Sequence, residues 1–182
     1  MTAIKDVRTF LLGMTQAVGA TPSSTQAAVL SQLLTLRIPC LKPGAGAAIG
    51  TGDDAAAGTD ITDNVLWSND TGFDVTLTGV SFRPGVTGFT ESTSVFSTMT
   101  LTKRTSAGAT STSVATATTN TVANGGLGTM TVGQTGAFTL TATIADRTIA
   151  AGACILYSKT HASTGTILPG GVITLTFRLG DA

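Results

Sequence analysis

The strongest constraint on the fold comes from the last apolar segment of the chain, where apolar residues occupy every second position. Ile173, Leu175, Phe177 and Leu179 alternate with mostly polar residues. Successive side chains of a β-strand point to opposite faces, so this pattern predicts a strand with one buried face. A helix would need a period of 3.6 residues, which the segment lacks.

Further short strand patterns precede this one from about residue 64 onward. We expect strands near residues 65–67, 75–82, 94–103, 112–118, 137–143 and 153–160. Thr, a β-branched strand former, occurs 37 times, and turn sequences such as 124–126 and 169–171 separate the strands. Seven or eight such strands predict an all-β fold, an antiparallel β-sandwich of jelly-roll type over residues 64–182. The residues expected to face inward are Val75, Leu77, Phe82, Leu101, Leu140, Leu156, Ile173, Leu175 and Phe177.

The first 41 residues follow a helical pattern instead. Five apolar residues between positions 4 and 18 are spaced three and four apart, which places them on one stripe of a helix. A second helix is expected to begin near residues 21–23, where Ser23 and Gln26 form a capping box, and to stop at Pro39. We predict that residues 1–41 are a helical attachment or assembly segment. Its predicted contact residues are Ile4, Val7, Leu11, Met14, Val18, Leu30, Leu33 and Leu34.

Residues 42–63 are rich in Gly, Ala and Asp and are predicted to be a linker. The glycines at 44, 46 and 50 lack the spacing and the flanking strand and helix of a dinucleotide loop. The acidic residues Asp53, Asp54, Asp60 and Asp63 do not follow the order of a calcium loop, so solvated linker charge is favoured over a cation site.

Few residues offer catalytic or metal chemistry. His161 is the only histidine, no nucleophile-elbow motif accompanies it, and we expect a hydrogen-bonded structural role at a strand end. Cys40 and Cys154 lie far apart, without metal-ligand spacing, and are expected to be free thiols. We therefore predict no enzymatic activity, no cofactor and no metal.

Charge and hydropathy exclude other classes of partner. Ten basic residues balance ten acidic ones, and Lys103–Arg104 is a lone basic pair, which argues against nucleic acid and anionic lipid as partners. The sequence contains no run of 18 apolar residues, so it predicts no membrane-spanning helix.

Two surface patterns stand out. Residues 105–145 contain no charged side chain, whereas exposed strands usually carry charge that prevents aggregation. This stretch is expected to be covered by neighbouring molecules, unless Thr and Ser alone keep it soluble. Thr-x-Thr repeats place hydroxyls on one strand face, as in ice-binding surfaces, although outward-facing Thr of half-buried strands would give the same pattern.

Over residues 65–179 the order of motifs resembles a family of tailed-phage head decoration or head-fibre proteins. The resemblance rests on the segments 73–84, 98–104 and 149–161, followed by Thr164-Gly165 and Pro169-Gly170-Gly171. The chain departs from the family at Ala153, where Asp is frequent, and in the longer turn at 162–165. These are strand and turn residues, so the resemblance implies architecture and a virion role but no catalytic residue.

The resemblance implies a structural virion protein that decorates or cements a capsid. Its expected partners are the major capsid protein and other copies of itself, with a trimer favoured over a dimer. The expected location is the capsid exterior, after assembly in the host cytoplasm. The alternatives are a fibre-tip module that binds a host receptor or glycan, and a Thr-rich ice-binding protein.

Overall fold

A computed structural model describes residues 34–40, 60–85, 87–105, 107–108, 112–164 and 168–179. For residues 34–40 and 179 it describes the backbone but not the side chains. Strands dominate these ranges. They are β1 (Leu34–Cys40), β2 (Ile61–Ser68), β3 (Val75–Pro84), β4 (Ser97–Arg104), β5 (Thr112–Thr118), β6 (Gly136–Ala137), β7 (Thr139–Leu140), β8 (Thr148–Ile149), β9 (Cys154–His161) and β10 (Gly171–Leu179). A 3-10 turn, η1 (Val122–Asn124), and a short helix, α3 (Ile144–Arg147), complete the described elements.

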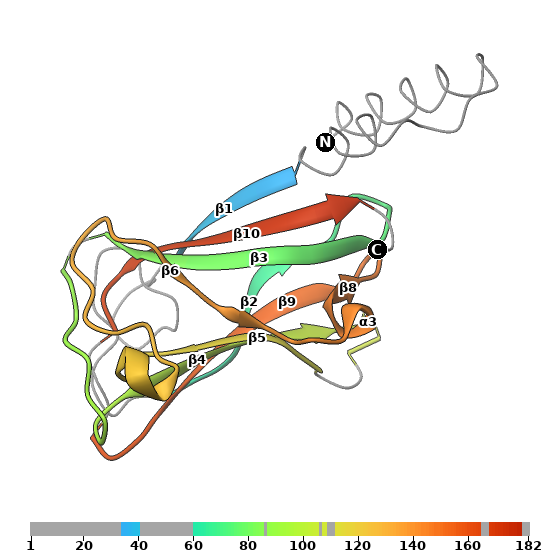
Figure 1. Cartoon of the computed structure of the whole chain (residues 1–182). Coiled ribbons are helices and arrows are strands. Elements are labelled where there is room, and N and C mark those ends of the chain that lie inside the picture. The colour runs from blue at the N-terminus through green and yellow to red at the C-terminus, as the bar shows by residue number, and fades with distance from the viewer. Residues whose placement is uncertain are drawn as a thin grey trace.

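The strands form two antiparallel sheets that pack face to face (Figure 1). The β1 sheet has the order β1-β10-β3-β6, with β8 also paired to β3, and the β2 sheet has the order β2-β9-β4-β5-β7. The chain crosses from one sheet to the other at most connections, and β4 and β5 form a hairpin. This strand order is that of a jelly roll, so the predicted fold class is confirmed.

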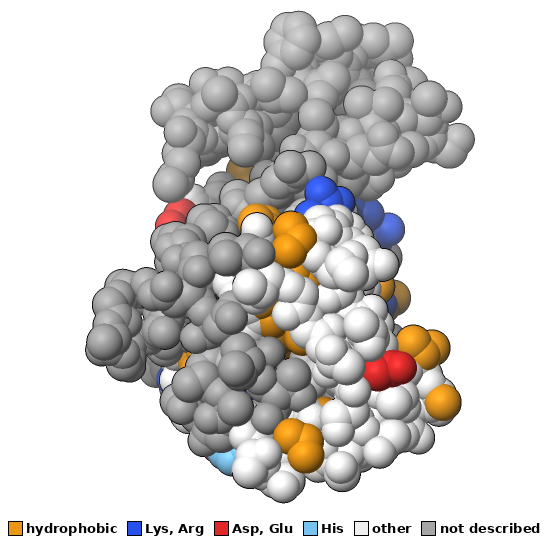
Figure 2. Space-filling view, turned by 90° about the vertical axis from the view of Figure 1, so that its left-hand side faces the viewer, with side chains coloured by type: hydrophobic (Ala, Val, Ile, Leu, Met, Phe, Trp, Pro, Cys, Tyr) orange, Lys and Arg blue, Asp and Glu red, His pale blue; other side chains and the backbone are white. Residues whose placement is uncertain are grey.

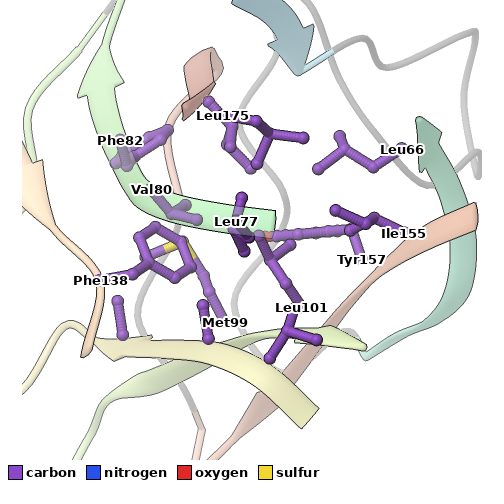
Figure 3. Packing of buried hydrophobic residues seen from close by; sticks show 14 of the residues in the cluster. Leu66, Leu77, Val80, Phe82, Met99, Leu101, Phe138, Ile155, Tyr157 and Leu175 are labelled. Carbon is purple, nitrogen blue, oxygen red and sulfur yellow. The ribbon is translucent and has the colours of Figure 1, made fainter. Parts of the chain in front are cut away.

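The core lies between the two sheets. Figure 3 shows Leu77, Phe82 and Leu175 of the β1 sheet directed towards Met99 and Leu101 of the β2 sheet. All five are at most 1% exposed. Seven of the nine residues predicted to face inward belong to this core cluster, and Leu140 packs against it half-buried. The alternation of apolar residues therefore located most of the core.

Leu156 is the exception among the predicted core residues. It is buried, but it lies outside the core cluster, whereas its neighbours Ile155 and Tyr157 belong to it. Because side chains alternate along a strand, Leu156 points to the outer face of the β2 sheet, where its register partners are Val65 and Thr102. The run of three apolar residues hid this alternation in the sequence.

The prediction of a helical segment over residues 1–41 is wrong at its C-terminal end. Residues 34–40 form β1, which pairs with β10 from Leu34↔Phe177 to Cys40↔Gly171. Pro39, expected to stop a helix, is accommodated because β1 is an edge strand, where a missing N–H can face away from the ladder. The predicted domain boundaries change accordingly, because β1 joins the sandwich and β2 begins at Ile61 rather than after residue 63. The helices predicted before residue 34 and the linker up to residue 59 lie outside the described residues.

The two ends of the sandwich differ. At one end, on the left of Figure 1, lie the described connecting residues 87–96, 119–135 and 162–164, and we call it the loop end. The strand ends Cys40, Gly171 and Pro84 are aligned there in register. β1 begins and β10 finishes at the opposite end, near α3. The segment that precedes β1 therefore joins the sandwich opposite the loop end.

Candidate binding surfaces

The outer face of the β2 sheet carries rows of hydroxyl groups, which we call the hydroxyl face. Met99 and Leu101 of β4 are fully buried, so the residues between and beside them point outward. Register places their hydroxyls in two rows across the sheet. The first row is Thr160, Thr98 and Thr118, and the second is Ser158, Thr100, Thr116 and Thr139.

The geometry of a sheet makes these rows regular. Strands are about 4.8 Å apart, and alternate residues of one strand are about 6.8 Å apart. All seven residues of the hydroxyl face are half-buried or exposed. The face therefore presents a regular array of groups that both donate and accept hydrogen bonds, without a charged side chain among them.

Charge appears only at the border of the hydroxyl face. Arg104 pairs with Asp63, and the backbone N–H of Asp63 donates to Ser158 Oγ at 3.1 Å. Both charged side chains are about one-third exposed, so this pair adds little stability. The Arg104–Asp63 ion pair connects the beginning of β2 to the end of β4.

The charge-free segment closes the edge of the sandwich beside β5. After η1, the chain pairs with β3 through β6 and then with β5 through β7. Thr141 N–H donates to Val114 O at 3.0 Å, and Leu127 N–H donates to Thr118 O at 2.9 Å. The segment thus blocks the β5 edge with its own backbone, which explains how this edge avoids strand pairing without charged residues.

Among the described residues, four large hydrophobic side chains are strongly exposed, and three of them lie in this charge-free segment. They are Val122, Val132 and Ile144, and the fourth is Val65 of β2. Figure 2 views the loop end, and most of its described surface is white, the colour of uncharged polar side chains and backbone. The described part of this end is therefore mostly neutral and polar, with isolated apolar side chains.

His161 forms the hydrogen bond expected of it. Its Nδ1 lies 2.6 Å from Asp60 Oδ1, which ties the end of β9 to the residue before β2. Ser97 is the register partner of His161, so the row resembles a Ser–His–Asp arrangement. Ser97 is fully buried, however, and this conformation gives a substrate no access to its hydroxyl.

Lys159 is a buried charge that the sequence did not reveal. It shares the inward face of β9 with Ile155 and Tyr157 and has no exposed surface. Burial lowers the pKa of Lys159 below its ordinary value, and the nearby Asp60 carboxylate opposes part of this shift. Only the alternation with its buried neighbours, residues 155 and 157, could have indicated that it points inward.

Asn69 is a second polar residue that sequence reasoning missed. It is fully buried at the turn after β2, where its Nδ2 donates to the carbonyl oxygens of Phe73, Ile149 and Ala150. Its Oδ1 accepts a hydrogen bond of 2.7 Å from Thr71 Oγ1. One side chain thus joins two turns at the end opposite the loop end.

The predicted contact residues fall mostly outside the described part of the chain. Leu34 begins β1, so its place is in the β1 sheet and not on a helix. The other seven, Ile4, Val7, Leu11, Met14, Val18, Leu30 and Leu33, lie outside the described residues. Cys154 is a free cysteine, as predicted, and the side chain of Cys40 is not described.

The described residues contain no group of three or more His, Cys, Asp or Glu side chains that could hold a metal ion. Among them, no helix has the length and apolar character needed to cross a membrane. No protein-family model, curated protein or solved structure matches the chain.

Proposed function

We propose that this chain is a structural virion protein that decorates or cements the capsid of a tailed phage, with no catalytic role. The observation that carries the proposal is the broad uncharged surface formed by the hydroxyl face and the charge-free edge beside β5. Such a surface suits close contact with another protein, because no charge must be desolvated when it is covered.

The sequence resemblance supports the same proposal. Its segment 73–84 covers β3, its segment 149–161 covers β9, and Pro169-Gly170-Gly171 leads into β10. The jelly roll also occurs in viral capsid domains, although a fold alone does not determine function. In this proposal the chain is a homo-oligomer, preferably a trimer, on the outside of the capsid.

The difference between the two ends of the sandwich supports one orientation on the capsid. The predicted apolar residues before β1 would contact the major capsid protein or sister chains, because the chain enters the sandwich at the end near α3. The loop end would then face outward. If that end binds a host glycan instead, a glycan array probed with the full chain should give specific signals, whereas the capsid-decoration proposal expects none.

Co-sedimentation with phage particles tests the proposed contact surface. Thr100→Lys adds a charge to the centre of the hydroxyl face, whereas Thr93→Lys adds the same charge to an exposed position at the loop end, away from the proposed contact. We expect Thr100→Lys to lower the bound fraction at least about tenfold, because a buried unpaired charge is costly, and Thr93→Lys to leave the bound fraction unchanged. Equal binding by both variants would remove the hydroxyl face from the proposed contact.

A second function is favoured by one observation, the alignment of hydroxyls into two rows. The ice-binding alternative requires a regular array of Thr side chains, and the aligned rows, six Thr and one Ser, support it. Thermal hysteresis of the full chain tests this alternative. Activity that Thr100→Lys abolishes would favour ice binding, and its absence at millimolar protein would reject it.

A further inference from the structure

The turn η1 presents an asparagine directly before a glycine. None of residues 122–124 is buried, and Figure 1 shows this turn at the loop end. The Nδ2 atom of Asn124 donates one long hydrogen bond of 3.5 Å to Asn120 Oδ1. The side-chain amide of Asn124 is therefore exposed and weakly held, and asparagine is one of the thermolabile residue types.

The next residue, Gly125, leaves its own backbone nitrogen unobstructed. Its φ of 74° is left-handed, a conformation that glycine adopts without strain. Apart from its chain neighbours, a Cβ added at Gly125 would meet no heavy atom within 4 Å, so the space around it is open. Without a side chain in the way, Gly125 N can approach Cγ of the Asn124 amide. The turn thus places the two groups of a cyclisation reaction next to each other.

One backbone hydrogen bond opposes this reaction while the turn is closed. Gly125 N–H donates to Val122 O at 3.0 Å, which holds the proton that the nitrogen must lose when it attacks. Turns at the surface open locally at little cost in free energy, without unfolding of the whole domain. The reaction should therefore proceed in the folded protein through brief opening of η1.

The other three asparagines of the chain lack this combination. Val65 follows Asn64 and Thr121 follows Asn120, and these β-branched side chains crowd the attacking backbone nitrogen. Asn69 is fully buried, and its Nδ2, the leaving group, donates to three backbone carbonyl oxygens. Exposure, a weakly held amide and a following glycine therefore coincide at one asparagine of the four.

We propose that Asn124 is a modification site of the folded protein, at which water converts the side-chain amide to a carboxylate. Gly125 N bonds to Asn124 Cγ while the Cγ–Nδ2 bond breaks, and the proton lost from Gly125 N leaves with Nδ2 as ammonia. Water then opens the resulting cyclic imide. Cleavage at Cγ gives aspartate in the original backbone, and cleavage at the backbone carbonyl carbon of Asn124 gives isoaspartate.

Both products change the surface of the loop end. Each places a negative charge in the segment 105–145, which otherwise has no charged side chain. Isoaspartate also lengthens the backbone by one carbon, which displaces Gly125 N–H from Val122 O and Gly126 N–H from Thr121 O. The turn is not part of the hydroxyl face, so this inference does not depend on the proposed function.

Ageing of the purified full chain in mildly alkaline buffer tests this site. Trypsin cuts after Arg104 and Arg147, so a single peptide, residues 105–147, carries both Asn120 and Asn124. Mass spectrometry follows the conversion of amide to acid, and fragmentation assigns it to one of the two asparagines. The variant Asn124→Asp supplies the aspartate product as a standard, and a second new peptide of the same mass identifies isoaspartate.

We expect two new peptides with the change at position 124, while the asparagines at 64, 69 and 120 stay intact. Asn124→Gln keeps an amide but requires a larger ring, so it should slow the conversion at least about tenfold. The proposal is overturned if the folded chain shows no conversion, if another asparagine converts first, or if Asn124→Gln converts at the natural rate.

Urea below the unfolding midpoint separates local opening from global unfolding. Urea lowers the stability of the whole sandwich, so a reaction through global unfolding would accelerate at least about tenfold before the midpoint. Opening of η1 alone exposes little new surface, so we expect a nearly constant rate. A steep rise with urea would show that the folded turn does not react, which would also overturn the proposal.

Discussion

Replacing Asn69 with Ala removes the side chain that joins two turns at the end of the sandwich opposite the loop end. Its Nδ2 donates to Phe73 O and Ile149 O at 2.8 Å each and to Ala150 O at 3.0 Å. The hydrogen bond to Ile149 O is buried, and the other two are partly buried. An alanine would leave these carbonyl oxygens without their donor and would also release Thr71 Oγ1.

The magnitude follows from the cost of unpaired polar groups. A buried acceptor that loses its partner costs about 1–3 kcal/mol, and water can reach the two partly buried oxygens and offset part of their loss. We therefore expect Asn69→Ala to lower the free energy of unfolding by about 2–5 kcal/mol. Domains of this kind are stable by only about 5–15 kcal/mol, so the effect should be large.

Urea unfolding followed by tryptophan fluorescence measures this loss. Trp67 is the only tryptophan, and its ring lies 4.4 Å from that of Phe177, centre to centre, so its emission reports on the packing between the sheets. The control is Asn124→Ala, because Asn124 is exposed and its side chain makes one long hydrogen bond of 3.5 Å. The reasoning is refuted if Asn69→Ala unfolds within about 0.5 kcal/mol of the natural protein, or if Asn124→Ala costs as much.

Three further predictions concern β1, Lys159 and the exposed valines. Deleting residues 1–33 should leave a folded sandwich. Deleting residues 1–40 also removes the seven cross-strand pairs of β1, so it should lower the free energy of unfolding in urea by roughly 1–7 kcal/mol more. Equal stability of the two truncated proteins would contradict the pairing of β1 with β10. Because burial lowers the pKa of Lys159, the unfolded chain binds this proton more tightly, so stability should rise as the pH increases towards 10.5. Lys159→Met should abolish that rise in urea midpoints measured from pH 7 to 10.5. If the variant keeps the pH profile of the natural protein, burial does not lower the pKa of Lys159 as argued. Val122→Asp and Val132→Asp should each change the unfolding free energy by less than about 0.5 kcal/mol, because both side chains are more than half exposed; a larger loss by calorimetry would place them in the packed structure.

The sequence predicted the sandwich where alternation was unbroken. β10 alternates from Ile173 to Phe177, and these side chains are fully buried. In β9 three consecutive apolar residues masked the alternation, so the side of Leu156 was assigned wrongly. Only long-range pairing could correct it, because register with Val65 and Thr102 places Leu156 on the outer face.

The error at β1 has a different physical origin. The leucines at 33, 34 and 36 continue the apolar spacing of the predicted helix, and Pro39 indicates the end of a helix when only its neighbours in sequence are considered. The neighbour that makes this segment a strand is β10, more than 130 residues further along the chain. Local propensity cannot detect such a partner, and tertiary pairing overrides it.

The candidate surfaces were predictable only in part. The Thr-x-Thr repeats showed that each strand would present hydroxyls on one face, but the alignment of Thr98 with Thr118 and of Thr100 with Thr116 depends on strand register. The buried Asn69 gave no recognisable signal, because its role depends on the backbone carbonyls of residues 149 and 150, far away in sequence. The sequence alone showed that residues 105–145 carry no charge. The structure adds that part of this segment covers the edge of β5.

The central proposal, that the chain decorates a phage capsid, is tested most directly by cryo-electron microscopy of tailed-phage particles. Particles assembled without the chain would be imaged before and after incubation with the purified full-length protein. The account predicts added density at fixed symmetric positions on the outside of the shell, into which the two-sheet sandwich fits with its loop end outward. Identical reconstructions at saturating protein would contradict it.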